Sequence, residues 1–340
     1  MKFTKALLIS TSIILLAACS VQSTDKGTKA ETRSGGLFGL GTAADYDVQT
    51  EGAFKNVKQV VIGGFKVGFL EETKASNKAS GGLMGGGFGG KSTAKVDLKG
   101  VDAALMQEIT DAAYADFIAQ LEKRGYTVAD RGELLKNRDY ANANKEKSPL
   151  REESSFLGAD ATITYVAPSN MEGLYFTGES GRSGGFGFGN PQVAAINFAE
   201  ENKIPVVFVT YQVDFANKAG GHAGITTSAV EVGQGISVPP GGGVRIIGGQ
   251  GGTFSSANGA ILFGQPVSSS DTFGTIENTS TDAGVAVETA ANIFSAVLGG
   301  GTNQTRSFEI TAVPAKYKAV SLKVLGSANE KITAKMLSLR

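Results

Sequence analysis

The sequence predicts a mixed α/β (α+β) fold, in which a β-α-α-β module is followed by a glycine-rich half that contains strands. In the first half, a strand-like run over residues 57–70 precedes a long amphipathic helical segment, a shorter one, and a second strand-like run over residues 161–166. In the second half, short segments with alternating apolar and polar residues are separated by glycine. Glycine supplies 47 of the 340 residues, which is roughly twice its usual share.

The first 20 residues predict export of the protein. Two lysines precede a mostly apolar, uncharged run over residues 6–18, which is shorter than the about 20 residues that a membrane helix needs. A short basic start, a short apolar run and small residues after it are typical of a secretory signal peptide. The run ends in Leu16-Ala17-Ala18-Cys19, which resembles the lipobox of bacterial lipoproteins. That resemblance implies diacylation of Cys19, cleavage before it and N-acylation of the new terminus. The alternative is an ordinary signal peptide in which Cys19 is incidental.

We expect the chain to have four parts. These are a signal peptide over residues 1–18, a lipidated flexible tether over 19–52, an α/β module over 53–170, and a glycine-rich β/α region over 171–340. The tether is polar and rich in glycine, a composition that is typical of flexible linkers. Within the module, residues 71–100 form a polar, glycine-rich insert with too few bulky apolar side chains to build a core.

The clearest predicted helix covers residues 102–124. Asp102 is a suitable N-cap, Gly125 is a natural residue just beyond the C-terminus, and apolar side chains recur every three or four residues along one face. Those side chains are Leu105, Ile109, Ala112, Ala113, Phe117 and Leu121. The next expected elements are a strand over 126–128, a shorter helix over 130–140 and a polar linker over 141–155.

The second half is predicted to contain a candidate hairpin over residues 206–238. Residues 206–215 and 229–238 each alternate between apolar and polar side chains, and a loop-like segment joins them. Their length of about ten residues fits a half-buried strand of a soluble sheet and also the 9–11 residues of a tilted membrane strand. The soluble sheet is the commoner use of such alternation and is favoured here. The other expected elements are helices over 193–201, 282–298 and 328–337, short β segments such as 260–263, and strands over 307–313 and 320–324.

Composition excludes several classes of function. Without the two lysines of the signal peptide, 30 basic residues face 32 acidic ones, so no basic excess indicates a nucleic-acid partner. Cys19 is the only cysteine and His222 the only histidine. We therefore expect no disulfide, no His/Cys metal site and no cofactor, although a carboxylate site for a hard cation stays open. No segment after the signal peptide is long and apolar enough for a membrane helix.

Two short motifs match enzyme patterns but lack the context that their chemistry requires. Residues 85–92 match the P-loop pattern, yet no strand leads into them and the next helix starts well after them. A flexible surface loop is expected there instead. Residues 181–185 match the GxSxG nucleophile elbow, and a hydrolase would use Ser183, Asp214 and His222 in that chain order. The expected helix after the serine is missing.

Charged side chains cluster around the predicted helix over residues 130–140. The acidic ones are Asp130, Glu133, Asp139, Glu152 and Glu153, and paired carboxylates of this kind can perform acid–base chemistry. The basic ones in the same run are Arg131, Lys136, Arg138 and Arg151. Mixed charge is typical of a solvated face, so we expect no catalytic residues and no enzyme activity.

One stretch of the sequence resembles a known family. The stretch contains a strand over 60–67, the long helix up to Gly125, and then Tyr126, Val128, Asp130, Arg131, Leu134 and Leu135, followed by Leu157-Gly158-Ala159-Asp160 before a strand. This order is similar to that of the curli-secretion-channel (CsgG-like) lipoproteins and related periplasmic α/β modules, over roughly the first half of the chain. The resemblance implies an outer-membrane lipoprotein that faces the periplasm, oligomerises into a ring and contributes hairpins to a shared barrel. Ser20, directly after Cys19, resembles the residue at that position in enteric lipoproteins of the outer membrane.

The expected function is therefore that of a structural or secretion-related subunit of an envelope assembly, with a CsgG-like channel as one form. The resemblance implies two kinds of partner: the lipid bilayer, through acylated Cys19, and copies of the chain or other envelope proteins. Two alternatives stay open. One is a periplasmic binding or adaptor lipoprotein without a pore, and the other is a serine hydrolase.

Overall fold

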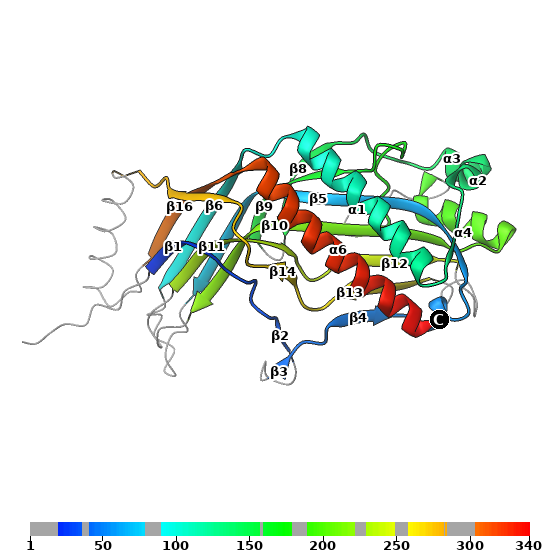
Figure 1. The fold of residues 1–340 in the computed structure, drawn as a ribbon, viewed down its shortest axis with the longest axis horizontal. Coiled ribbons are helices and arrows are strands. Elements are labelled where there is room, and N and C mark those ends of the chain that lie inside the picture. Colours follow the sequence, from blue (N-terminus) through cyan, green and yellow to red (C-terminus); the bar gives the residue numbers. More distant parts are fainter. Residues whose placement is uncertain are drawn as a thin grey trace, which may run out of the picture.

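A large mixed β-sheet with helices on both faces confirms the predicted mixed α/β class (Figure 1). The computed structural model describes residues 20–35, 41–78, 90–156, 159–178, 189–221, 229–248, 258–281, 283 and 303–340. Within these residues the main sheet has 14 strands, and its longest path runs β15-β16-β6-β5-β10-β12-β13-β4. The predicted signal peptide and Cys19 lie outside the described residues, as does the predicted helix over 282–298 except for Ala283.

The two longest strands form the middle of the sheet. β5 (Gln59–Lys78) and β10 (Val206–Gly221) pair in parallel, with Val206 opposite Val61 and Val213 opposite Phe69. β5 belongs to the predicted module and β10 to the predicted glycine-rich region, so one sheet crosses the expected boundary at residue 170. Side chains of both strands lie in the same apolar core.

The predicted polar insert over residues 71–100 is wrong where the structure describes it. β5 continues to Lys78 and pairs antiparallel with β6 (Lys91–Lys99). β6 alternates strictly, with one set of side chains buried in the protein and the other facing outward. The buried set is Ser92, Ala94, Val96 and Leu98. Small and medium side chains at every second position are sufficient for a half-buried strand, because only one face of it must be apolar.

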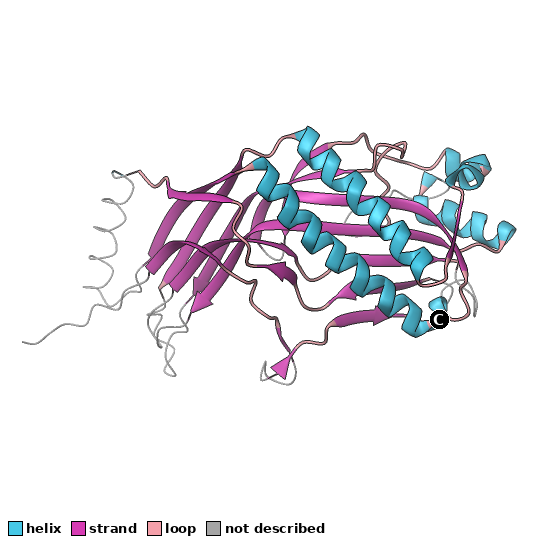
Figure 2. Cartoon of the chain, in the orientation of Figure 1, coloured by secondary structure: helices cyan, strands magenta, loops and turns pink. Residues whose placement is uncertain are grey.

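Two long helices cover one face of the sheet, side by side (Figure 2). α1 (Ala103–Lys123) confirms the predicted helix, and the Asp102 carboxylate accepts a hydrogen bond from Leu105 N at 2.8 Å as its N-cap. Ala112, predicted to be on the buried face, is exposed, and Met106 and Thr110 are buried instead. Gly125 follows at a φ of +76°, where a side chain would be strained.

The second of these helices, α6 (Pro314–Leu339), corrects the predicted strand over 320–324. The predicted helix over 328–337 is the last part of the same element. The buried residues of α6 recur at helical spacing through the whole segment, which is the reason that it is helical. They are Tyr317, Val320, Ser321, Val324, Leu325, Ala328, Asn329, Ile332, Thr333 and Met336.

Short elements lie on the opposite face and at one end of the sheet. The predicted helix over 130–140 is two helices, because Asn137 ends α2 (Arg131–Lys136) and its side chain caps α3 (Arg138–Ala141) by accepting from Tyr140 N at 3.0 Å. With α4 (Pro191–Asn202), they pack around a second, smaller core. The predicted linker over 141–155 contains β8 (Leu150–Phe156), which pairs with β9 (Ala159–Val166). The short β7 (Thr127–Ala129) lies beside the start of β5.

The predicted hairpin is present as β10 and β11 (Ala229–Val238), which pair antiparallel. The predicted flexible tether is wrong at two places, because its backbone joins the sheet. β1 (Ser20–Gly27) pairs in parallel with β11, and β4 (Tyr46–Gln49) pairs with β13 (Gly259–Phe263). The remaining elements are β2 (Ser34–Gly35), β3 (Gly41–Thr42), the 3-10 helix η2 (Glu51–Phe54), β12 (Gly243–Ile247), β14 (Val267–Ser269), β15 (Gly274–Asn278) and β16 (Asn303–Ala312). No helix within the described ranges is both long and apolar enough to cross a membrane.

Candidate functional site

The start of the described chain and the turn ends of two hairpins meet at one end of the sheet (Figure 1). Ser20, which directly follows Cys19 in the sequence, pairs with Ala229, and Ala229 also pairs with Gly221. Lys91 pairs both with Lys78 and with Asn303, the first residue of β16. Because β5 and β10 run in parallel, their last residues point to the same end. We call this the hairpin end, defined by Ser20, Lys78, Lys91, Gly221, Ala229 and Asn303.

The strands near the hairpin end are amphipathic. β6 keeps Ala94, Val96 and Leu98 inside the protein, while its other face carries charged side chains. Lys95 Nζ lies 3.2 Å from a carboxylate oxygen of Glu72 on β5 and 3.9 Å from one of Asp97. The outward face of this hairpin is therefore polar, and its apolar face is used inside the single copy.

β10 is buried on both faces near its start. On one face Val206 and Phe208 belong to the smaller core beside α4. On the other face the side chains have no exposed surface and belong to the core that includes α1 and α6; they are Val207, Val209, Tyr211, Val213 and Phe215. The Tyr211 ring lies 6.0 Å from the Phe65 ring of β5 in an edge-on arrangement. This confirms the expectation that the alternating set of β10 packs as part of a sheet against helices.

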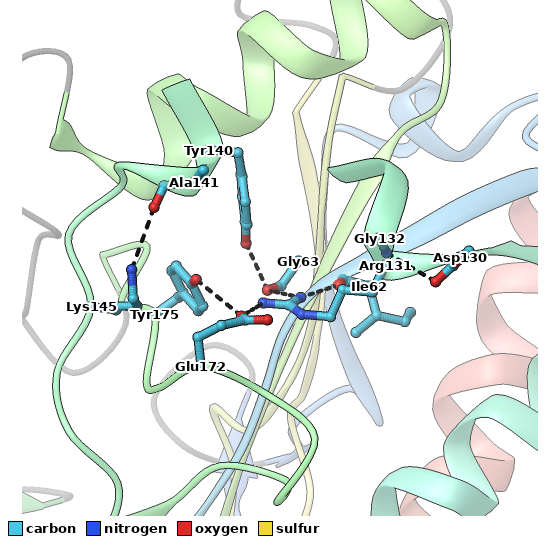
Figure 3. A network of polar contacts seen from close by, with 10 residues as sticks. All are labelled: Ile62, Gly63, Asp130, Arg131, Gly132, Tyr140, Ala141, Lys145, Glu172 and Tyr175. Carbon is cyan, nitrogen blue, oxygen red and sulfur yellow. Dashed lines mark hydrogen bonds and ion pairs between the residues drawn. The ribbon is translucent and has the colours of Figure 1, made fainter. Parts of the chain in front are cut away.

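A partly buried polar network joins α2 to the irregular part of β5 (Figure 3). Arg131 is the first residue of α2, behind the N-cap Asp130, whose carboxylate accepts from Gly132 N at 2.9 Å. The guanidinium of Arg131 donates from Nη1 to Ile62 O at 2.6 Å and to Gly63 O at 2.7 Å. Its Nη2 donates to Glu172 Oε2 at 2.7 Å. One side chain thus fastens a helix, a strand and the loop after β9 to one another.

The carbonyl oxygens of Ile62 and Gly63 can accept hydrogen bonds from Arg131 because β5 has one extra residue at this point. The pairing of β5 with β10 shifts between Val207, which faces Ile62, and Phe208, which faces Gly64, so Gly63 forms a bulge. Only glycine fits there, because a Cβ would lie 2.4 Å from Val206 Cγ1. Gly63 O also accepts from the hydroxyl of Tyr140 at 2.6 Å.

Two tyrosines close the network. The Tyr140 and Tyr175 rings stack with centroids 5.4 Å apart, and the Tyr175 hydroxyl donates to Glu172 Oε2 at 3.3 Å. Burial raises the pKa of Tyr140, and burial raises the pKa of Tyr175 to about 12. Burial opposes ionisation of Glu172, but the hydrogen bond from Arg131 holds the pKa of that carboxyl below its ordinary value of 4.5. At neutral pH no member of this set exchanges a proton, so the network is structural.

The sequence-based interpretation of these charges holds for most residues and is wrong for Arg131. Lys136 and Arg138 have side chains that are 73% and 91% exposed, as a solvated face requires. The Arg131 side chain is only 12% exposed. No local pattern distinguishes Arg131 from its neighbours, because its partners Ile62, Gly63 and Glu172 are far away in the sequence.

Acid should weaken this network. The folded-state pKa of Glu172 is lowered, so its stabilising effect is fully present above about pH 4.5 and is lost as pH falls through the folded-state value. We expect Glu172→Gln to lower the free energy of unfolding at neutral pH, with a difference from the wild type that shrinks below pH 4.5. Urea unfolding of the wild type and of Glu172→Gln, measured from neutral pH to below pH 4.5, checks this prediction. Glu133→Gln, at an exposed pair with Lys136, is the matched control. A difference that stays constant with pH contradicts the prediction.

The enzyme motifs gain no support from the described residues. Lys91 and Ser92 start a strand, not the helix that a P-loop needs to bind phosphate. Ser183 and His222 lie outside the described residues. Asp214, the third residue of the hydrolase alternative, is buried, and its Oδ1 accepts from Ala216 N at 3.1 Å. Within the part of the chain that the structure describes, no three His, Cys, Asp or Glu side chains gather as a metal site.

Comparison with known proteins finds no matching family description, no matching curated protein and no matching solved structure. Among the residues on which the CsgG-like resemblance rests, Leu134 is fully buried, and Arg131 donates to the bulge of β5. Leu157 and Gly158 lie outside the described residues.

Proposed function

We propose that the chain is a lipid-anchored subunit of an outer-membrane assembly, facing the periplasm and associated with copies of itself or with other envelope proteins. The observation that supports this proposal is the position of Ser20 at the hairpin end, paired with Ala229. Because Cys19 directly precedes Ser20, acyl chains on Cys19 bring the turn ends of both hairpins to the bilayer surface. Three acyl chains exceed the two signals that stable anchoring takes.

The secretion-related form of this function is a channel, as the CsgG-like resemblance implies. β6 has an apolar set, Ala94, Val96 and Leu98, and a polar set that includes Lys95 and Asp97, which is the alternation of a strand between lipid and water. Its 9 residues and the 10 residues of β11 match the about 9–11 that a tilted membrane strand needs. No single hairpin satisfies its own edges in hydrocarbon. The channel therefore takes several copies, and in each the apolar faces of β6 and β11, which are buried in the single copy, turn outward to lipid on assembly.

A binding or adaptor role without a pore is the second candidate. It is favoured by the burial of β10, because Val209, Tyr211 and Val213 are already enclosed within one copy. In this form the hairpins stay part of the sheet, and the anchored body presents its surface to a partner. The serine hydrolase alternative has no described contact in its favour and is not proposed.

Ring formation and conductance distinguish a channel subunit from an adaptor without a pore. The lipoprotein extracted in mild detergent and imaged by electron microscopy should form closed rings if it is a channel subunit, and planar-bilayer recordings should then show conductance. Monomers that never conduct, from membranes in which the protein is anchored, favour the adaptor. A protein that is released from membranes without detergent contradicts the proposal in both forms.

Cys19→Ala should move the protein from the membrane to the soluble fraction or stop its processing. The expectation follows from the lipobox, because the thiol of Cys19 is the group that takes the lipid. Without that thiol the chain has no acyl anchor to hold it at the membrane. Cell fractionation with immunoblotting measures it, and Ser20→Ala is the matched control because it leaves the thiol in place. Normal processing together with unchanged membrane retention of Cys19→Ala rules out lipidation at this residue.

A further inference from the structure

Arg245 is a partly buried charged residue that has no partner within the part of the chain that the structure describes. It lies on β12, opposite Phe208 of β10 on one side and Ala260 of β13 on the other. Among the described residues, its guanidinium has neither a hydrogen bond nor an ion pair, whereas Arg131 and Arg151 each meet a glutamate within 2.9 Å. Partly buried guanidinium groups are usually paired, because taking the charge out of water without a partner is costly.

A small hollow lies beside this side chain. Arg245 pairs with Ala260, and Ala260 pairs with Gln49 of β4, so the small alanine side chain separates two long ones on the same face of the sheet. The hollow measures about 80 Å³. Its polar lining side chains are Gln49, Thr50, Thr177, Gln192, Arg245 and Asn258.

Among the described residues that line the hollow, Arg245 is positively charged and none is negatively charged. Asp47 is an acidic neighbour that lies outside the lining, where its Oδ2 accepts from Gln49 Nε2 at 3.2 Å. Thr50 holds a left-handed backbone with a φ of 51°, and its hydroxyl does not cap the helix η2 that follows. A left-handed non-glycine residue is uncommon and frequently marks a functional position.

We propose that this hollow binds a carboxylate group, with Arg245 as its ion-pair partner. The planar fork of a guanidinium matches the two oxygens of a carboxylate, and the amides of Gln49, Gln192 and Asn258 offer further donors. The volume admits a carboxylate with a short stem but not a nucleotide or sugar, whose sites take about 300–1,000 Å³. The carboxylate belongs either to a small organic acid or to the end of a peptide chain. The site lies at the start of β10, away from the hairpin end, and does not depend on the proposed membrane role.

Binding is tested with the full chain in detergent. The probes are sodium acetate, an alanine tripeptide with a free carboxylate, and the same tripeptide with a C-terminal amide, titrated by calorimetry at constant ionic strength. We expect saturable binding of at least one carboxylate probe and none of the amide. Arg245→Gln should weaken that binding about tenfold or more, the loss expected from one charged hydrogen-bonded pair. Arg138→Gln, at a side chain that is 91% exposed, should bind as the wild type does.

The outcomes show whether the bound carboxylate belongs to a small organic acid or to the end of a peptide chain. Binding of acetate as well as the tripeptide indicates a small organic acid, and binding of the tripeptide alone indicates a chain end. Arg245→Lys keeps the charge but loses the planar fork of the guanidinium, so it should also bind the carboxylate probe more weakly. This variant serves as the test if Arg245→Gln does not fold. No saturable binding by the wild type, equal binding of the amide, or unchanged binding in a folded Arg245 variant overturns the proposal.

Discussion

Val209→Arg should prevent the whole chain from folding. Val209 has no exposed surface, and it sits in β10 between Phe65 of β5 and Val244 of β12. A guanidinium at this position would point into the apolar core under α1 and α6, where a charge taken out of water is costly. Its cost is comparable with the entire stability of a domain, about 5–15 kcal/mol.

Circular dichroism and limited proteolysis of the purified variant measure this effect. The matched control is Val313→Arg, because Val313 is 46% exposed and an arginine there stays in water. A variant that keeps a folded, protease-resistant body but loses conductance contradicts the prediction. It would show that this part of β10 meets lipid, where an arginine costs about 2–4 kcal/mol and blocks insertion only.

Arg131→Met should lower the free energy of unfolding by about 1.5–3 kcal/mol, the range for losing hydrogen bonds to a charged group at a partly exposed pair. Methionine fills a similar volume but donates no hydrogen bond. Glu172 then loses its charge partner, and the carbonyl groups of Ile62 and Gly63 lose the donor that the bulge of β5 depends on. That loss includes the carbonyl left without a donor, which costs about 1–3 kcal/mol where water does not reach it.

Urea unfolding of three variants tests the role of the fork. Arg131→Lys should recover little of the loss, because one ammonium cannot reach two carbonyls and a carboxylate with the geometry of a guanidinium. Lys136→Met, which removes an exposed pair with Glu133, should change stability by less than about 1 kcal/mol. Equal effects of Arg131→Met and Lys136→Met would show that the network contributes nothing beyond surface charge.

The sequence predicts those elements whose signals are local. The helix from Ala103 to Lys123 has its N-cap, its periodic apolar face and its terminal glycine within one stretch. The error at residues 320–324 has a different origin. Two valines there suggested a strand, although the spacing of Tyr317, Val324 and Ile332 continues one helical face through the whole segment. Local β propensity is a weak signal when a longer period competes with it.

Other features have no local signal. β1 has the polar sequence SVQSTDKG and joins the sheet through backbone pairing with β11, which side-chain patterns do not reveal. The function of Arg131 depends on a bulge in β5, and the hollow at Arg245 depends on Ala260 and Gln49, two residues on other strands. The sequence shows the residue types of these sites, but only the register of the strands brings them together.

The pairing of Ser20 with Ala229 also has a consequence for folding, because it joins residues that are far apart in the sequence. The first strand lies about 200 residues before its partner in the chain, whereas α1 and the β5–β6 hairpin pair residues that are close in sequence. Pairings of such long separation are slow to close. We therefore expect the edge of β11 to be completed after the local elements, when the first residues of the chain return to it.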